Sequence, residues 1–569
     1  MRPSAACQRA ERNEVDSGTH LAVRPLLAEA VQRLVLVAEL AGGVLAFYRL
    51  EADGVRTLLT QEYTDDKALP ARYYTQEFRA SSFAAQFAFS SDVEEMMFGV
   101  GQQACCRDST VNKKGQVVDL LNFNSQVPIP VFMSSKGYLI FFKYPGQGRM
   151  EFGQYRTRFV AEEVTVVDYY ITTAPVGDYD ALQQQYTAVT GRQPTPPDFL
   201  IGYQQSKLRY FNQTHVLDVA QRFHDEGINL ALLVVDFFAW KYQGDWSFDS
   251  SLWPDPAGMV TEVKRLTGAE MMVSLWPSVE DLWLEHHRHY QQAIDEGHHN
   301  LTDTPAGATE CKYMSLTRST FAGGQRFCSY MWSGDTMSRF DVLLQQITAG
   351  VSVTASGISS WTLDIGGFTG LNVESAYGRQ LFVRWIAMGT FLPFMRVHGN
   401  RQCSLSGPSD IFSANSCPNE VWVSSAFYHL VTQKDTQPWA YGEENFPIVK
   451  NYISERYKLV PYVKKLFQQL QATGRSIMRP LYYDFSLSDP IVVNGTRAND
   501  GLVTHQFMLG PRILVSPVGI ENATSKDVYL PILNQEQKNQ GWTWQHWWTG
   551  KDYGMFYLGN KEDILSGNI

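Results

Sequence analysis

The sequence predicts an α/β protein: a (β/α)8 TIM barrel flanked by an N-terminal β-sandwich and a truncated C-terminal β-sandwich. Apolar segments of strand length alternate with segments of helical periodicity from Phe199 to about Thr473, which is typical of parallel strands joined by helices. Shorter strands with turn residues between them precede and follow this region. We therefore expect three domains, at residues 1–194, 195–474 and 475–569.

The first of these regions is predicted to be all-β. Runs of alternating polarity such as TRFVAEEVTVVDYYITT are separated by Pro-Gly and Ala-Asp-Gly turn signals, and FMSSKGYLIFF is a further strand candidate. Repeated short strands of this kind suggest a sandwich of two sheets. Three prolines in GRQPTPPDF form a stiff linker that ends the region.

The barrel region begins with the predicted strand FLIGYQQS and the helix THVLDVAQRFHDEG, in which apolar residues recur at helical spacing until Gly227. The later predicted strands include INLALLVVDFF, AEMMVSLWPS, YMSLTRS, GISSWTLDIGG and FLPFMRVHG. Only seven strand-like ends can be counted, because a polar helix and a loop occupy the interval between LWPSVED and CKYMSL. The predicted barrel is therefore incomplete at its fourth strand.

The region after about Asp500 returns to β structure. HQFMLGPRILVSPVG and DVYLPI are predicted strands, and the aromatic segment WTWQHWWTG follows them. The chain ends soon afterwards, so the predicted C-terminal sandwich looks incomplete.

Composition excludes some classes of partner. The formal charge of -10 and the pI near 5.7 argue against nucleic acid, which usually needs a basic patch. No apolar run is long and free enough of charge to predict a membrane span. The charged N-terminus does not resemble a signal peptide.

The compartment stays open at this level. Four N-x-S/T sequons, at Asn212, Asn300, Asn494 and Asn522, are compatible with a secretory-pathway origin, although chance supplies a few in a chain of this length. The seven cysteines show no metal-ligand spacing, and Cys403 and Cys417 could form a disulfide if the protein is secreted.

Three aspartates follow apolar strand segments of the predicted barrel: Asp236, Asp335 and Asp364. Cleavage of a glycosidic bond with retention needs two carboxyl groups, one to attack the anomeric carbon and one to protonate the departing oxygen. Asp335 lies close to Trp332 in the sequence. A general acid needs a raised pKa, and burial of the carboxyl group beside an aromatic ring can supply it. An aspartate at a strand end is also often only a helix cap.

Two further side chains are candidates for sugar or carboxylate contacts. Arg318 could hold sugar hydroxyls or a neighbouring carboxylate, although the residue type and position favour a structural ion pair. His398 ends a strand-like segment and could donate to a hydroxyl, but a lone histidine is usually a satisfied core residue.

The motifs TRSTFAGGQRF…WSGD, WTLDIGGF, DFFAWKYQGDWSFD…WPDP and FMRVHGN together resemble glycoside hydrolase family 31. FGVGQ and YTAVTGRQPTPP are similar to the N-terminal domain of that family. The resemblance implies an N-terminal β-sandwich, a (β/α)8 barrel and C-terminal β domains. It also implies retaining hydrolysis of terminal α-linked glucose or xylose, without metal or cofactor.

The resemblance also implies roles for individual residues. Asp335 matches the acid/base, and Asp236 matches the acid that binds hydroxyls of the bound sugar. The other residues expected in the same subsite are Arg318, Asp364, His398 and Trp276. Asn124, in the NFNSQVPIP loop, is expected to reach the pocket from the N-terminal region.

One departure from the family pattern affects function. The family's nucleophile is an aspartate at the end of the fourth strand, and no matching segment is found here. Glu280 and Asp281 are the only nearby substitutes. The sequence therefore predicts an α-glucosidase or α-xylosidase by family, with a catalytically inactive carbohydrate-binding protein as the alternative.

Overall fold

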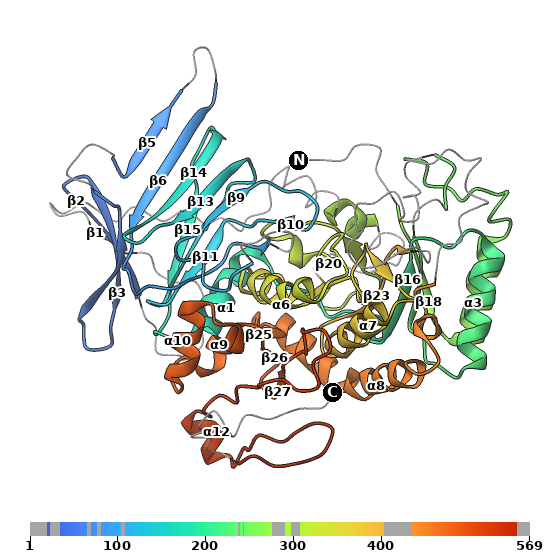
Figure 1. Cartoon of the computed structure of the whole chain (residues 1–569). Helices are drawn as coiled ribbons and strands as arrows, with labels where there is room; N and C mark the ends of the chain where they lie inside the picture. Colours follow the sequence, from blue (N-terminus) through green and yellow to red (C-terminus); the bar gives the residue numbers. More distant parts are fainter. Residues whose placement is uncertain are drawn as a thin grey trace.

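The computed structural model describes residues 20–22, 35–64, 70–76, 81–103, 109–236, 239–242, 244–275, 291–297, 308–402 and 435–554. In Figure 1 the N-terminal β strands, in blue and cyan, lie beside a central body of strands and helices in green, yellow and orange. The C-terminal residues, in red, pass beneath both parts.

The N-terminal part contains three larger antiparallel sheets. Their strand orders are β1 (His20–Ala22), β2 (Val35–Ala41), β3 (Val44–Leu50), β4 (Arg56–Gln61); β5 (Arg72–Thr75), β6 (Phe83–Ser90), β14 (Arg156–Val164), β13 (Gly148–Phe152), β9 (Val117–Leu120); and β15 (Tyr169–Thr173), β12 (Tyr138–Phe142), β11 (Val131–Ser134), β7 (Met97–Gly99). Alternate residues of β14 are buried, as the period of a strand requires. Phe159 of β14 stacks on Phe142 of β12 with ring centroids 4.1 Å apart, so two sheets share one apolar core.

Two features of this part differ from the prediction. FMSSKGYLIFF forms the hairpin of β11 and β12 rather than one strand, because the chain reverses at Gly137, where φ is +83°. The region is not all-β, since helix α1 (Tyr179–Thr190) lies before the proline-rich linker. Asp178 caps this helix by accepting a hydrogen bond from the Ala181 backbone N–H at 2.9 Å.

A short antiparallel ribbon connects the N-terminal part to the central body. It consists of β8 (Gln102–Gln103) and β10 (Gln126–Val127). Trp361 of the central body donates its indole N–H to the Gln102 side-chain oxygen at 2.8 Å, and both residues are fully buried. Because an indole donor is costly to bury without a partner, this bond fixes the ribbon against the central strands.

The central body is built on parallel strands. One sheet has the order β18 (Glu270–Val273), β17 (Leu232–Val235), β16 (Tyr203–Lys207), β23 (Met395–Val397), and a second has β19 (Ser315–Thr317), β20 (Ser329–Trp332), β21 (Trp361–Thr362). A parallel bridge from Ile365 to Val397 joins the two. Together they make one arc, with β18 and β19 at its ends.

The position of the expected fourth strand lies between β18 and β19. The described part of the chain has no strand there, and it shows no closure of the arc into a barrel. Residues 276–290 and 298–307, which belong to this interval, lie outside the described residues, as do Trp276, Glu280 and Asp281. The missing nucleophile strand therefore stays a prediction.

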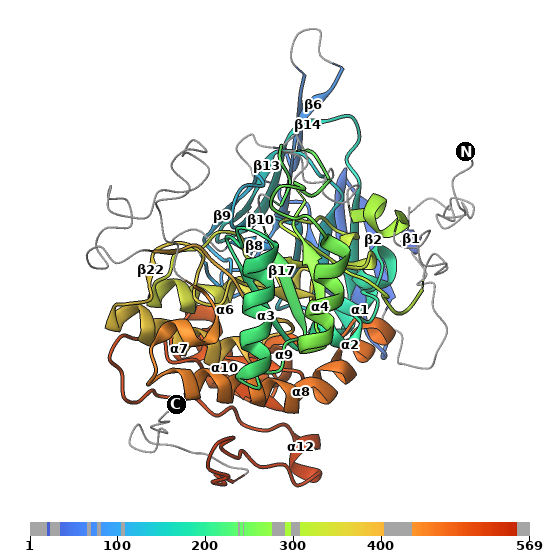
Figure 2. The same cartoon turned by 90° about the vertical axis from the view of Figure 1, so that its right-hand side faces the viewer.

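The central body has five helices of eight or more residues in the described ranges, and the first of them has the predicted periodicity. They are α3 (Gln213–Asp225), α4 (Pro256–Thr267), α6 (Phe340–Ala355), α7 (Ala376–Gly389) and α8 (Phe446–Thr473). Figure 2 shows α3 and α4 side by side in front of β17. The first predicted strand is partly wrong, because its opening residues form the short helix α2 (Asp198–Ile201) before β16 begins. Pro197 is the residue that directly precedes α2, and its fixed φ angle favours the start of this helix.

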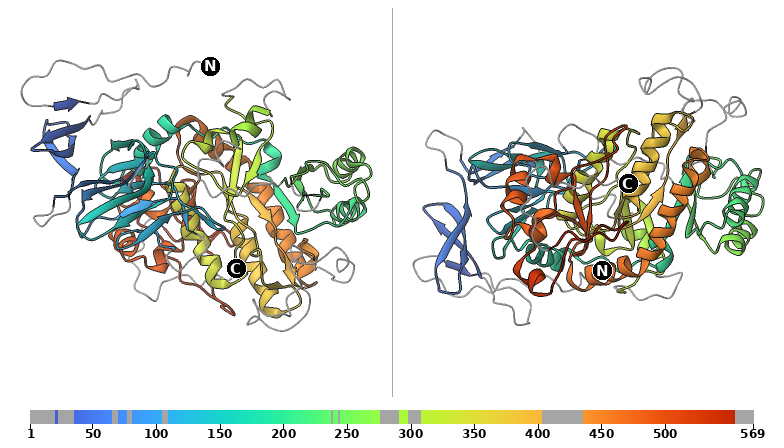
Figure 3. Two further views of the ribbon diagram at one scale, coloured as in Figure 1. Left: turned by 90° about the horizontal axis from the view of Figure 1, so that it is seen from above. Right: turned by 60° about the horizontal axis from the view of Figure 1, so that its bottom comes forward.

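The C-terminal part contains one three-stranded antiparallel sheet in the described ranges, with β25 (Met478–Pro480), β26 (Phe507–Leu509) and β27 (Ile513–Val515). Its helices are α9 (Leu481–Phe485), α10 (Pro490–Ala498), α11 (Gly501–Thr504) and α12 (Gln535–Asn539). The strand predicted in DVYLPI is wrong, since residues 527–532 have no regular secondary structure. Figure 3 shows the C-terminal helices beside the N-terminal sheets, where Tyr482 stacks on Phe98 with centroids 3.9 Å apart.

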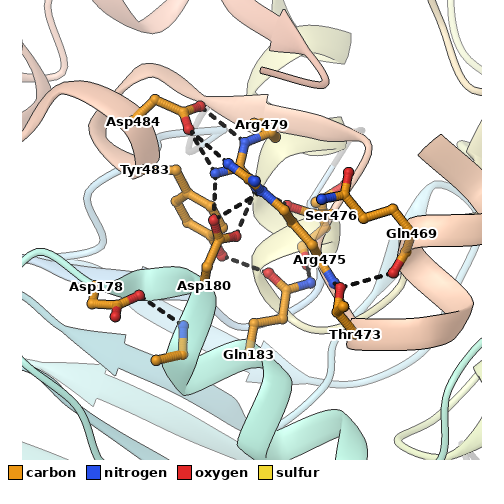
Figure 4. Close-up of polar contacts among 12 residues, drawn as sticks. Asp178, Asp180, Gln183, Gln469, Thr473, Arg475, Ser476, Arg479, Tyr483 and Asp484 are labelled. Atoms are coloured by element: carbon orange, nitrogen blue, oxygen red, sulfur yellow. Dashed lines mark hydrogen bonds and ion pairs between the residues drawn. The ribbon is translucent and has the colours of Figure 1, made fainter. Parts of the chain in front are cut away.

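A buried ion-pair cluster joins the N-terminal helix α1 to the C-terminal part (Figure 4). The fully buried guanidinium of Arg479 donates to both carboxylate oxygens of Asp180, at 2.7 and 2.8 Å, and to both of Asp484, at 2.8 and 2.9 Å. Arg475 adds a second cation 3.1 Å from Asp180. Two arginines thus neutralise two carboxylates where the parts meet.

A disulfide joins Cys311 to Cys328, both of which are buried. It closes a 17-residue separation that contains β19 and the loop after it. This pairing was not predicted, and Cys403 and Cys417 lie outside the described residues. No helix in the described ranges has the length and apolar character needed to span a membrane.

Candidate active site

Five predicted site residues lie at the carboxyl ends of the parallel strands. Asp236 follows β17, Arg318 follows β19, Asp335 follows β20, Asp364 follows β21 and His398 follows β23. The carboxyl ends of parallel strands meet at one edge of the sheet, which is where barrel enzymes place their active sites. The strand pattern in the sequence therefore brings these side chains to one edge.

Asp335 is half-buried and held by two donors. Its Oδ2 accepts a hydrogen bond from Arg318 Nη2 at 2.5 Å and another from Asn124 Nδ2 at 3.0 Å. The side chains of Asp335 and Arg318 keep 30% and 31% of their surface exposed, so the carboxyl group stays accessible to a ligand. Arg318 is therefore an ion-pair partner of the candidate acid. This agrees with the expectation that Arg318 holds a neighbouring carboxylate.

Asp364 is completely buried. Its Oδ1 accepts a hydrogen bond from Nη1 of Arg396, a residue of β23, while its Oδ2 has no hydrogen-bond partner among the described residues. Burial raises the pKa of Asp364 to about 6, an effect that Arg396 opposes and the nearby charge of Asp335 reinforces. The two carboxylates follow neighbouring strands, β20 and β21, at one edge of the sheet.

The raised pKa of Asp364 predicts a specific pH dependence of stability. Because its pKa is above the usual 3.8 in the folded state, protonation favours folding, and this contribution is lost as the pH rises through about 6. The stability of the native protein relative to Asp364→Asn should therefore fall by up to about 3 kcal/mol between pH 4 and pH 7. Urea unfolding of both proteins across this range measures the difference, and a constant difference would contradict the prediction.

His398 links Asp236 to the first strand of the central body. Its Nε2 lies 3.3 Å from Asp236 Oδ2, and its Nδ1 is 2.7 Å from the hydroxyl oxygen of Ser206, at the end of β16. Burial and the charges of Arg396 and Arg401 hold the pKa of His398 well below its usual value, so the ring is neutral. A neutral ring that donates from Nε2 to the carboxylate accepts the Ser206 hydroxyl proton at Nδ1.

A tryptophan ring connects the two halves of the site. The guanidinium carbons of Arg318 and Arg396 lie 5.9 and 5.7 Å from the centroid of the Trp332 ring. Cations near the ring are attracted to its negative face, which helps to keep both arginines in place. Arg318 then contacts Asp335 and Arg396 contacts Asp364, so one ring supports both carboxylate partners.

A buried arginine fixes the backbone beneath the site. The fully buried Arg401 donates to the backbone oxygens of Gly367 at 2.7 Å, Ile365 at 3.1 Å and His398 at 3.0 Å. Its Nε also donates to the Tyr441 hydroxyl at 3.1 Å. The loops after β21 and β23 are thereby tied together, which restricts Asp364 and His398 to one arrangement.

Sequence reasoning missed Arg396, Arg401 and Ser206. Arg396 lies on β23 and His398, two positions later, directly follows that strand, so the period of a strand places both side chains on the same face. That spacing was a usable signal. The roles of Ser206 and Arg401 depend on contacts between separate strands and loops, and no local pattern indicates them.

The arrangement favours acid–base chemistry with hydroxyl-rich ligands. It presents one accessible carboxyl group, one buried carboxyl group with an unpartnered oxygen, and a neutral histidine paired with a third carboxylate. Among the described residues no group of three or more His, Cys, Asp or Glu side chains is placed to hold a metal ion.

Comparison with protein families gives two matches. The model described as the glycosyl hydrolases family 31 TIM-barrel domain matches residues 193–308 and 286–412. The model of the glycosyl hydrolase family 31 C-terminal domain matches residues 474–563. The two segments of the first match overlap at residues 286–308, within the interval that follows β18.

Individual relatives extend the similarity over nearly the whole chain. Alpha-xylosidase A of Aspergillus niger is 39% identical over an alignment of 655 residues that covers 93% of this chain and 85% of that protein. The solved xylosidase from Aspergillus niger has a TM-score of 0.83 with 37% identity, covering 97% of this chain and 90% of that one. A family 31 alpha-xylosidase from a soil metagenome, solved with xylose, has a TM-score of 0.73 and 26% identity, covering 91% and 88%.

Proposed function

Because the chain is a glycoside hydrolase that belongs to family 31, we propose that it removes terminal, non-reducing α-linked xylose or glucose with retention, and that xylose is preferred. The preference for xylose rests on the relatives, since both solved structures compared above are xylosidases. The observation that carries the proposal is a set of acidic and basic side chains at one edge of the parallel strands, in which the Asp335 carboxyl group is accessible while Asp364 and His398 are buried.

The residues of the site have separate roles in this proposal. Asp335 protonates the departing glycosidic oxygen and then removes a proton from water. Asp364, which the family resemblance places in the same subsite, contributes to sugar binding as a buried carboxyl group held by Arg396. Asp236 and His398 bind further hydroxyls, and Arg318 holds the charge of Asp335 between the two steps. This chemistry needs no metal or cofactor.

We also propose the domain organisation expected from the sequence. Residues 1–194 would form a β-sandwich, residues 195–474 a barrel that lacks its fourth strand, and residues 475–569 a C-terminal β domain. The shared apolar core of two N-terminal sheets and the family matches that begin at residues 193 and 474 support these boundaries.

The second candidate function is sugar binding without hydrolysis, the alternative expected from the sequence. In the part of the chain that the structure describes, no strand separates β18 from β19, where the family's nucleophile is expected. The alignment with the Aspergillus niger alpha-xylosidase is longer than the whole chain of 569 residues, so that protein has residues without a counterpart here. Loss of a nucleophile costs on the order of 10⁴- to 10⁶-fold in turnover.

An external nucleophile separates the two functions. We expect release of 4-nitrophenol from its α-xyloside to exceed release from its α-glucoside by roughly 10–200-fold, the discrimination that one small substituent allows. If the protein has no nucleophile of its own, added azide attacks the anomeric carbon as nitrophenol departs with the proton of Asp335, and β-xylosyl azide forms. NMR spectroscopy identifies this product.

The anomer of the product identifies the mechanism. A retaining enzyme with its own nucleophile releases xylose first as the α anomer without azide. A binding protein without hydrolysis shows neither product but retains xylose affinity in calorimetry. Absence of hydrolysis, azide product and binding together would overturn both candidate functions.

A further inference from the structure

Asn124 and Asp335 are joined by two hydrogen bonds although 211 residues separate them in the chain. Asn124 donates from Nδ2 to Asp335 Oδ2 at 3.0 Å, and its Oδ1 accepts the backbone N–H of Asp335 at 2.8 Å. The Asn124 side chain therefore binds Asp335 at both its carboxyl group and its backbone. The two bonds together fix the rotation of the Asp335 side chain relative to its own peptide.

The loop that carries Asn124 lies directly against the backbone before Asp335. A Cβ atom at Gly334 would lie 2.6 Å from the Ser125 nitrogen and 2.8 Å from Asn124 Oδ1, and Gly334 has a φ of +77°. Glycine at this position allows the approach. The Ser125 hydroxyl donates to the backbone oxygen of Asp335 at 3.4 Å, so the contact continues along the loop.

Internal hydrogen bonds hold this loop, which runs from β9 to β10, in one conformation. Phe123 and Gln126 exchange backbone hydrogen bonds of 3.2 and 2.9 Å across a tight turn. The Gln126 side-chain amide donates to the backbone oxygen of Asp119 at 3.2 Å. The neighbouring β8 is fixed to the central body through Gln102 and Trp361. Asn124 is thus supported well enough to orient another group.

The two donors to Asp335 share one oxygen. Arg318 and Asn124 both donate to Oδ2, and Oδ1 accepts no hydrogen bond from any residue that the structure describes. A proton carried by the carboxyl group therefore resides on Oδ1. We propose that Asn124 is a positioning residue, which sets the carboxyl plane of Asp335 so that Oδ1 and its proton face the glycosidic oxygen. This inference rests on the proposed function, in which Asp335 is the acid.

The dependence of rate on leaving group tests the inference. Departure of an alkoxide needs a well-placed proton, whereas departure of fluoride needs little help. We expect Asn124→Ala to lower kcat/KM for methyl α-xyloside by roughly 10- to 100-fold, and for α-xylosyl fluoride by less than about threefold. Asn124→Asp, which keeps the shape but removes the donor, should give the same pattern. Every assay contains azide at one fixed concentration. If the protein has no nucleophile of its own, azide takes that role, and the effect of the leaving group can still be measured.

Three comparisons decide the result. Leu121→Ala, on the same loop and 36% exposed, should leave both substrates unaffected. Equal loss for both substrates in Asn124→Ala, or full activity in Asn124→Asp, would overturn the positioning role. Asp335→Ala separates the two hypotheses: if this variant lacks the leaving-group dependence, the proposed acid is wrong. If Asp335→Ala shows the dependence on leaving group and Asn124→Ala does not, Asp335 is the acid and only the inference about Asn124 fails.

Discussion

Asp335→Ala is expected to lower turnover of unactivated α-xylosides by about 10²- to 10⁴-fold, the usual contribution of a general acid. The carboxyl group is the accessible one in the site, and Arg318 and Asn124 already orient it. Binding of xylose should change little, because Asp364, Asp236 and His398 remain in place. Steady-state kinetics with methyl α-xyloside and calorimetry with xylose measure the two quantities.

The control for this variant is Asp341→Ala. Asp341 lies in the first turn of α6, pairs with Arg339 and keeps 53% of its side chain exposed. Its removal should change turnover by less than about twofold, since an exposed ion pair contributes little. Equal losses in the two variants, or xylose binding abolished by Asp335→Ala, would argue against a role confined to proton transfer.

Arg479→Met is expected to give the largest loss of stability, about 3–5 kcal/mol in the free energy of unfolding. The substitution keeps much of the side-chain volume but leaves Asp180 and Asp484, only 19% and 10% exposed, without their main partner. Two buried carboxylates of like charge then repel each other. Urea unfolding, followed by fluorescence and circular dichroism, measures the change in the midpoint.

The matched control is Arg339→Met, which removes an arginine of similar pairing at the surface. Arg339 and Asp341 lie 2.6 Å apart with exposed fractions of 48% and 53%. This variant should lose no more than about 1 kcal/mol. A loss of that size in Arg479→Met as well would show that the cluster does not hold the N-terminal and C-terminal parts together.

The cluster also has a defined acid sensitivity. Burial alone would raise the pKa of Asp180, but the charges of Arg479 and Arg475 outweigh this effect and hold that pKa below its usual value of 3.8. Because the folded-state pKa is lowered, the stabilisation exists above the unfolded pKa and disappears as the pH falls. The pKa of Asp364 is raised instead, so its contribution to stability is lost as the pH rises. Asp180 therefore limits stability at the low end of the acidic range and Asp364 at the high end.

Local patterns in the sequence predicted the regular elements of the central body well. The apolar residues of α3, Val216, Val219, Ala220 and Phe223, are all buried as their spacing indicates. Helix α4 carries the same kind of local signal, since Asp255 caps its start and Gly268 ends it in the left-handed conformation. The ends of the parallel strands could also be located from a local pattern. A buried parallel strand is a short apolar run, so the first polar residue after the run marks its end.

Contacts between distant segments could not be predicted in this way. The family resemblance indicated that Asn124 reaches the pocket, and the structure places it against Asp335. Its two hydrogen bonds there, the disulfide of Cys311 and Cys328, and the support from Arg401 all depend on how loops meet in three dimensions. The strand expected in DVYLPI failed for a related reason. The Tyr529 hydroxyl and the Ile532 backbone N–H both donate to Asp489 Oδ2, so side-chain contacts replace a strand ladder there.

The ribbon of β8 and β10 makes the candidate acid depend on two parts of the chain. The parallel strands supply Asp335 and Arg318, but the remaining donor to the carboxyl group comes from a loop encoded 211 residues earlier. The contact of Gln102 with Trp361 holds that loop's ribbon against the central strands. Substitutions that loosen this contact would therefore alter the orientation of the acid without touching it.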